Sequence, residues 1–283
     1  MHALRVPTGK IAVCPLGQSS FLLKSPGGFL LALDPYLSNS CLAVGRPLGI
    51  NMNRLHPPPM RPADLVGIHG YLLTHTHADH LDWETLRPYR RAGGRGPYVA
   101  PPEACEKLRV EGVPESQIRM IWPNREVRIG DFTLRATFAI PFGGDDLTHV
   151  GYLIRVPKGP VLYFTGDTRW HEKLPSFVKD HRPDILFTVI NPFGNLDPGQ
   201  AAQLAKELGV KQVIPCHHDL FPDNSLPPRL LHTNLAALGL GRIYRELARG
   251  KFSIFGRRYA EVIPSREDDN PKKNSPSWEK SFS

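Results

Sequence analysis

The amino-acid sequence predicts an α/β protein, in the mixed α+β sense, with two stacked β-sheets covered by helices in a four-layer αββα sandwich. The chain has 283 residues, 41% of them hydrophobic and 22% charged, so it can bury a large core. Short apolar runs bounded by Gly, Pro, Asn and Asp recur along it as buried strands do. Helical patterns alternate with pairs of these runs, which favours helices covering two sheets that pack face to face.

Residues 1–264 are predicted to form one domain and residues 265–283 a disordered tail, because the tail is polar and contains Pro. The chain starts without the apolar core of a signal peptide, and no run approaches the roughly 18 apolar residues of a membrane span. Four scattered cysteines without a CxxC pair are typical of reduced, mostly buried thiols. We therefore expect a soluble cytoplasmic protein with no membrane span.

The first half of the chain predicts an antiparallel opening sheet followed by alternating strands and helices. The pair Gly27-Gly28 lies between two apolar runs, as a hairpin turn would. Residues 41–61 are rich in Gly, Pro and Asn, which is too irregular for a helix or a central strand but long enough for a functional loop, where His56 could contact substrate. The predicted strands are 11–13, 20–23, 29–33, 70–73 and 98–100, and the predicted helices run from 83 to about 90 and from 103 to 111.

The second half continues the alternation and ends in a mixed segment at 243–263. Asp197 is a predicted N-cap, with Pro198 at the first helical position after it. Cys216 lies at a strand end, where we expect it to pack rather than to bind metal. The predicted strands are a pair within 127–140 around the turn Gly130-Asp131, then 150–156, 161–164, 184–190 and 212–215, and the predicted helices are 198–208 and 229–241.

Residues 74–82, with the sequence THTHADHLD, carry the densest group of metal-competent side chains in the chain. They follow the short apolar run at 70–73. In an extended segment, residues two apart face the same way, so His75 and His77 can present their rings to one ion. Asp79 and His80 follow on a turn and can aim at a second point nearby. Such a nitrogen and oxygen site suits zinc, manganese or iron. For Asp82 we prefer the role of N-cap of the following helix.

THTHADHLD resembles the HxHxDH motif of the metallo-β-lactamase-fold hydrolases. The Asp34 segment, Gly166-Asp167-Thr168 and the VIPCHHDLF stretch around Cys216 are most similar to the L-ascorbate-6-phosphate lactonase (UlaG-like) branch of that family, over residues 11–228. The resemblance implies that Asp34 supports the histidine loop without touching metal. It also implies that one ion is held by His75, His77 and His149 and that a second is held or bridged by Asp79, His80, Asp167 and His217. The longer Gly-Asp loop before His149 leaves Asp145 or Asp146 open as the third ligand of the first ion.

These residues predict a hydrolase with one or two divalent ions per chain, zinc or manganese. The ions would activate a water that opens a lactone or cleaves a small, possibly phosphorylated, ester. Asp79, Asp167 and His218 are the predicted catalytic residues, although His218 could instead pack. One alternative is a phosphodiesterase for RNA, a cyclic nucleotide or an N-acyl phospholipid. Another is a binding protein that is stabilised by metal but has no activity.

The formal net charge of +8 fits a small anionic substrate. It also fits nucleic acid, which we do not favour because no aromatic-rich recognition motif accompanies the charge. The oligomeric state does not follow from the sequence. Basic residues are dense in two stretches, Arg87, Arg90, Arg91 and Arg95 in the first and Arg242, Arg245, Arg249, Lys251, Arg257 and Arg258 in the second.

Overall fold

The computed structural model of the chain describes residues 1–142, 146–257 and 263–264. The tail predicted at residues 265–283 lies outside these ranges, and one domain across residues 1–264 stays a prediction. None of the helices in the described ranges is long and apolar enough to cross a lipid bilayer. The four cysteines are buried thiols, as predicted.

The strands form two sheets. Sheet 1 has eight strands in the order β14-β13-β1-β2-β3-β4-β5-β6, and sheet 2 has six in the order β12-β11-β10-β9-β8-β7. The bounds in sheet 1 are β1 (Lys10–Gly17), β2 (Ser20–Lys24), β3 (Leu30–Leu33), β4 (Gly70–Leu72), β5 (Tyr98–Ala100), β6 (Ile118–Met120), β13 (Ser253–Gly256) and β14 (Ile263–Pro264). Those in sheet 2 are β7 (Glu126–Ile129), β8 (Phe132–Ala139), β9 (His149–Arg155), β10 (Val161–Phe164), β11 (Ile185–Val189) and β12 (Gln212–Cys216).

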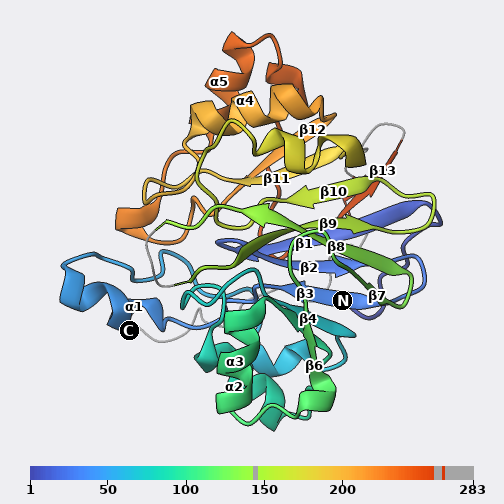
Figure 1. The fold of residues 1–283 in the computed structure, drawn as a ribbon, viewed down its shortest axis with the longest axis vertical. Helices are drawn as coiled ribbons and strands as arrows, with labels where there is room; N and C mark the ends of the chain where they lie inside the picture. Colours follow the sequence, from blue (N-terminus) through green and yellow to red (C-terminus); the bar gives the residue numbers. More distant parts are fainter. Residues whose placement is uncertain (143–145, 258–262, 265–283) are drawn as a thin grey trace, which may run out of the picture.

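The helices cover the two outer faces of the sheet pair, which confirms the predicted αββα layers. Figure 1 shows α2 and α3 beyond sheet 1 and α4 and α5 beyond sheet 2, with the sheets stacked between them. A short α1 extends to one side of the stack. The bounds are α1 (Cys41–Gly45), α2 (Trp83–Arg91), α3 (Pro102–Val110), α4 (Pro198–Leu208) and α5 (Arg229–Ala237).

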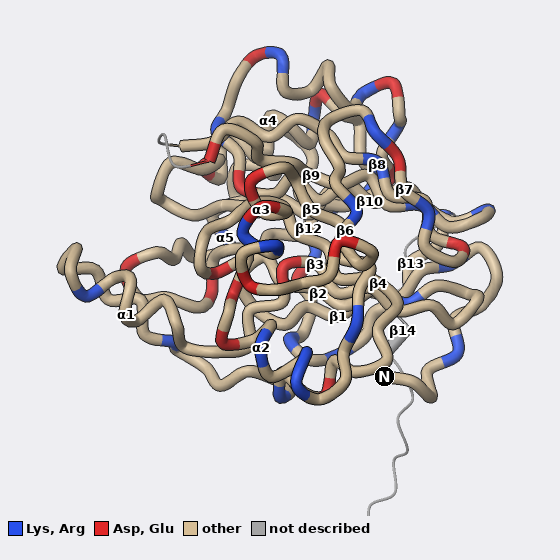
Figure 2. The backbone as a smooth tube through the Cα atoms, turned by 60° about the horizontal axis from the view of Figure 1, so that its bottom comes forward, with Lys and Arg blue, Asp and Glu red and all other residues tan. Residues whose placement is uncertain are grey.

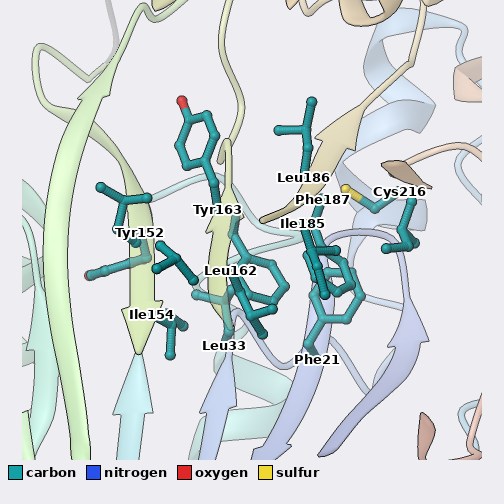
Figure 3. Packing of buried hydrophobic residues seen from close by; sticks show 14 of the residues in the cluster. Phe21, Leu33, Tyr152, Ile154, Leu162, Tyr163, Ile185, Leu186, Phe187 and Cys216 are labelled. Atoms are coloured by element: carbon teal, nitrogen blue, oxygen red, sulfur yellow. The ribbon is translucent and has the colours of Figure 1, made fainter. Parts of the chain in front are cut away.

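The apolar runs are nearly continuous because most strands are covered on both faces. In β2, Phe21 and Leu23 face the core between the sheets, whereas Leu22 faces the core under α2 and α3. Figure 3 shows Phe21 and Leu33 of sheet 1 packing toward the side chains of sheet 2. Two aromatic contacts join the sheets. The ring centroid of Phe21 lies 5.1 Å from that of Phe164 and 5.3 Å from that of Phe187.

The strand predicted at 11–13 runs on as β1 to Gly17, because Pro15 and Gly17 still pair with Phe21 and Ser20 of β2. Most other predicted elements are confirmed to within two residues at their ends, with three further exceptions. Residues 41–61, predicted to be too irregular for a helix, contain the five-residue α1, whose buried Cys41 and Gly45 anchor an otherwise exposed turn. β6 was not predicted, because in this short edge strand Ile118 alone is buried. α5 ends at Ala237 rather than at 241, because Gly239 takes a φ of 74° that a helix cannot continue through.

The order of the strands brings distant parts of the chain to one edge of the sandwich. β3 and β4 run parallel in sheet 1, and β10, β11 and β12 run parallel in sheet 2. The carboxyl ends of parallel strands meet at the same edge of a sheet. The residues after β3, β4, β10 and β12 therefore meet the β1–β2 turn and the start of β9 there.

Replacing Phe187 by Ala tests the core between the sheets. Its ring is fully buried and stacks on Phe164 with 4.2 Å between ring centroids. We expect Phe187→Ala to lower the free energy of unfolding by about 3–5 kcal/mol, because a cavity opens between the sheets. Urea denaturation measures this loss. The control is Val110→Ala, where the side chain is 82% exposed and a change below about 0.5 kcal/mol is expected. Equal losses in the two variants would contradict the assigned packing.

Candidate metal centre

The predicted site residues lie at or just beyond the ends of strands, at one edge of the sandwich. His75 follows β4, Asp167 follows β10, His217 follows β12, and His149 is the first residue of β9. The turn before Asp167 depends on Gly166, which has a φ of +62°. A Cβ there would lie 2.4 Å from the main-chain oxygen of Val150. A glycine at this position lets β10 end against β9 and turn Asp167 into the centre.

A tight turn carries Asp79 and His80. The main-chain oxygen of His77 accepts hydrogen bonds from the N–H groups of His80 and Leu81, at 3.0 and 2.8 Å. Immediately afterwards Asp82 caps α2 by accepting a hydrogen bond from the N–H of Glu84, at 3.0 Å. The preferred reading of Asp82 as an N-cap is confirmed.

The structure brings all of the predicted ligands together in overlapping groups. Within each group the ligand atoms lie within 4.8 Å of one another, a span that one metal ion could bridge. His75 and His80 each belong to two groups, so the groups adjoin. In the described part of the chain the groups are His75, His77 and His149; His75, His80 and Asp167; and Asp79, His80 and His217.

Three imidazoles in these groups each direct a free ring nitrogen into the centre. Nδ1 of His80 lies 2.8 Å from a carboxylate oxygen of Asp34, and Nδ1 of His149 lies 3.2 Å from the main-chain oxygen of Asp167. Both oxygens can only accept, so each Nδ1 carries a proton, and in the neutral ring each Nε2 keeps its lone pair. Nδ1 of His75 similarly meets the hydroxyl of Thr74 at 2.9 Å.

Buried polar atoms without partners mark the centre as a cation site. Nε2 of His75, His80 and His149 and Oδ1 of Asp167 are all buried, and none has a hydrogen-bond partner among the described residues. Orphaned buried atoms of this kind are costly unless an ion or a water meets them. Three lone pairs and one carboxylate oxygen are donors that suit a divalent ion such as zinc or manganese. The residues present therefore fit a metal centre.

The electrostatics of the centre also favour added positive charge. Burial would lower the pKa of His217, but the carboxylates of Asp167 and Asp79 outweigh it and raise that pKa to about 10. Burial would also lower the pKa of His80, but the same two carboxylates outweigh burial and raise that pKa well above its usual value. The same carboxylates would favour a divalent cation, which on binding to His80 or His217 would displace a proton from the ring.

Asp34 holds the histidine loop from behind. Its two carboxylate oxygens accept hydrogen bonds from the main-chain N–H of Thr74 at 2.8 Å and from the hydroxyl of Thr74 at 2.5 Å, besides the one from His80. The carboxylate is fully buried and belongs to none of the metal-competent groups. These contacts fit the supporting role expected for Asp34.

Asp146 clamps the histidine loop and lies outside the metal-competent groups of the described residues, although its Oδ2 is 3.9 Å from Nε2 of His149. Its carboxylate accepts hydrogen bonds from the N–H and the hydroxyl of Thr76, both at 2.7 Å, and Lys107 donates to the same hydroxyl at 2.5 Å. His149, not Asp146, shares a group with His75 and His77. This geometry favours His149 as the third ligand of the first ion, and Asp145 lies outside the described residues.

Two contacts to the centre had no signal in the sequence. The amide nitrogen of Gln18 lies 3.0 Å from Asp79 Oδ2, and the amide of Asn195 donates to Asp167 Oδ2 at 2.8 Å. Asn195 also donates to Asn191, which in turn donates to Asn224. Single Gln and Asn residues in turns carry no motif, so spatial proximity alone identifies them.

His218 faces a groove beside the centre, outside the metal-competent groups of the described residues. The groove has a volume of about 460 Å³, and Asp219, Glu246 and Arg249 also line it. Arg249 donates to Asp219 at 2.5 Å, so its charge is largely matched there. Burial lowers the pKa of His218, which keeps its ring neutral near neutral pH. His56, which the sequence left open as a residue that could contact substrate, is exposed on the loop that follows α1.

A family model described as the beta-lactamase superfamily domain matches residues 31–218. This range is more than half of the chain and contains every residue of the metal-competent groups.

Individual relatives agree with the family match. A metal-dependent hydrolase of Myxococcus xanthus is 28% identical over 225 residues, covering 76% of this chain and 72% of the relative. A probable L-ascorbate-6-phosphate lactonase of Shigella boydii is 26% identical over 265 residues, covering 80% of this chain and 74% of that protein. Among solved structures, the metallo hydrolase Igni18 of Ignicoccus hospitalis has a TM-score of 0.68 at 19% identity, over 87% of this chain and 98% of that one. The last similarity supports the fold.

Changing Asp146 to Asn tests the clamp. An amide cannot accept both hydrogen bonds from Thr76, so the segment between His75 and His77 should loosen against the loop that brings His149. We expect zinc affinity to fall about tenfold or more, as is typical when a residue that orients metal ligands is changed. Competition with a chromophoric chelator measures it. The control is Glu172→Gln, which removes an exposed carboxylate. Unchanged affinity in Asp146→Asn would contradict the clamp.

Proposed function

This chain belongs to the β-lactamase superfamily and is a metal-dependent hydrolase, and from that premise we propose that it opens a lactone or cleaves another small ester, possibly phosphorylated, at a binuclear centre. One observation carries the proposal: three buried imidazole nitrogens and one buried carboxylate oxygen, none with a hydrogen-bond partner within the described ranges, converge at one sheet edge. Hydrolysis at a carbonyl needs a water made nucleophilic near neutral pH and an acceptor for the charge that develops.

We assign the first ion to His75, His77 and His149 and the second to Asp79, His80 and His217, with Asp167 between them. The donor set is nitrogen and oxygen without thiolate, which suits zinc or manganese. When bound, the ions make hydroxide available near neutral pH and polarise the attacked carbonyl.

The protein's own groups have separate tasks. Asp79 is the proposed proton carrier to the leaving oxygen. Burial would raise the pKa of its carboxyl, but His80 and His217 outweigh burial and lower that pKa, so the group is ionised near neutral pH. Asp167 is proposed to align the two halves of the centre, since Asn195 donates a hydrogen bond to its Oδ2 while its Oδ1 lies 3.3 Å from Nε2 of His80. His218 lines the adjoining groove as a contact for substrate.

The substrate we propose is small and anionic. The relative named as a probable lactonase of L-ascorbate 6-phosphate supports a phosphorylated lactone. The net charge of +8 would attract such an anion toward the protein. Nucleic acid remains less favoured, since Figure 2 shows basic residues interleaved with acidic ones over much of the molecule.

A second candidate is the phosphodiester of an N-acyl phospholipid, and one observation favours it. Phe142, Leu147 and Phe193 are 60%, 83% and 47% exposed. They lie on the loops that lead to His149 and Asn195, beside the centre. Exposed apolar side chains around a site are typical of an apolar ligand, such as an acyl chain. The guanidinium of Arg169 over the ring of Phe142, at 5.6 Å, adds a positive charge at the same place.

Replacing Asp167 by Ala tests the centre itself. The change removes a carboxylate whose Oδ1 lies 3.3 Å from Nε2 of His80 and whose Oδ2 lies 3.4 Å from Nε2 of His217. We expect loss of at least one equivalent of metal and a fall in hydrolysis of at least about a hundredfold. Elemental analysis of the purified protein gives the metal content and identity. If Asp167→Ala keeps both its metal and its activity, the assigned centre is wrong.

An assay panel separates the two candidate substrates. We expect turnover of a phosphorylated sugar lactone to exceed that of bis-p-nitrophenyl phosphate, of RNA and of an N-acyl phospholipid in micelles. Faster turnover of the phospholipid, reduced by Phe193→Ser, would favour the second candidate. Metal binding without turnover of any panel member would instead favour the binding protein without activity.

A further inference from the structure

Gln18 in the β1–β2 turn is a buried residue that joins the two parts of the chain holding the second ion. Its amide nitrogen lies 3.0 Å from Oδ2 of Asp79 and 3.3–3.4 Å from the two ring nitrogens of His217. Asp79 and His217 are themselves 3.1 Å apart. The amide therefore reaches both residues at their point of contact.

The orientation of the amide follows from its neighbours. A carboxylate oxygen can only accept a hydrogen bond, so the NH₂ group of Gln18, and not its carbonyl, faces Asp79. The other end, Oε1, is buried and has no hydrogen-bond partner in the described part of the protein. Gln18 is 3% exposed, so bulk water does not satisfy that oxygen. Leaving Oε1 of Gln18 buried without a hydrogen bond is unfavourable, and the hydrogen bond from its NH₂ group to Asp79 offsets that cost.

The backbone makes a second link between the same residues. The main-chain oxygen of Gln18 accepts a hydrogen bond from the N–H of His217, at 3.0 Å. Gln18 and His217 both have positive φ angles, 53° and 60°, which residues with side chains rarely adopt. Unfavourable backbone conformations persist where the surroundings hold them, and they gather at functional sites.

From these contacts we propose that Gln18 is a positioning residue for the second ion. Its side chain fixes the carboxylate of Asp79, and its main chain fixes the backbone at His217. The pair is thereby held in a geometry that receives a divalent cation. The inference rests on the proposed function and names a residue for one half of its centre.

Two substitutions separate the side chain from the backbone. Gln18→Asn keeps an amide and tolerates positive φ well, but it is one methylene shorter and falls short of Asp79. Gln18→Met keeps the length and loses the hydrogen bonds. The matched control is Ser19→Ala in the same turn, because Ser19 is equally buried and its hydroxyl faces Cys216 Sγ at 4.0 Å.

The experiment removes bound metal from the full chain with a chelator and then adds Co²⁺. Visible absorption and calorimetry measure how Co²⁺ binds. We expect wild type and Ser19→Ala to bind two equivalents. In Gln18→Asn and Gln18→Met the second equivalent should bind about 10- to 100-fold more weakly and with an altered spectrum, while the first is unchanged. Hydrolysis should show a lower kcat with an unchanged KM.

A double variant with Asp79→Asn tests whether Gln18 acts through Asp79: adding Gln18→Met should then weaken cobalt binding little further. Binding of the second equivalent by Gln18→Asn as tightly as by wild type would overturn the inference and leave the proposed function intact. Wild-type protein that binds no second cobalt ion would overturn the two-ion function, and this inference with it.

Discussion

The candidate metal centre depends on the buried carboxylate of Asp34. It accepts hydrogen bonds from the main chain and the hydroxyl of Thr74 and from His80. A buried carboxylate without donors would be strongly destabilising, so the end of β3 and the loop after β4 must stay together. The same contacts fix which nitrogen of His80 carries its proton and, through the Thr74 hydroxyl, orient the ring of His75. One carboxylate outside the metal-competent groups of the described residues thereby orients two imidazole rings.

The layered fold explains why the polar residues gather where they do. Strands covered on both faces have no room for unpaired polar side chains in their middles, so such residues lie beyond the strand ends. Parallel neighbours then bring those ends to one edge. Loops of opposite sheets meet there, and Asp167 of sheet 2 comes to lie 3.3 Å from His80 of sheet 1. The pairing of Phe21 with Phe164 and Phe187 keeps the sheets in register behind this edge.

Local patterns predicted the layers, most elements and the dense motif at residues 74–82, because apolar periodicity and ligand spacing are properties of short segments. The residues brought together with that motif, such as Asp167 and His217, were assigned by family resemblance. What remained hidden depends on contacts between distant segments. Gln18 and Asn195 look like ordinary turn residues, and Asp146 could not be told from a ligand until its carboxylate was located on Thr76. The sequence did not predict β6 or α1, because each buries too few side chains to produce a periodic apolar pattern.

The contact between Gln18 and His217 joins residues 199 positions apart. During synthesis from the N-terminus, Gln18 and the dense histidine motif therefore exist long before His217 does, and Asp79 lacks its contact with His217 until β12 has been made and docked. A partly made chain can offer His75 and His77 to passing ions but cannot enclose an ion between the two sheets. The site proposed for a second ion is thus completed only after β12 has been made, and a chain truncated before β12 would lack the His217 side of that site.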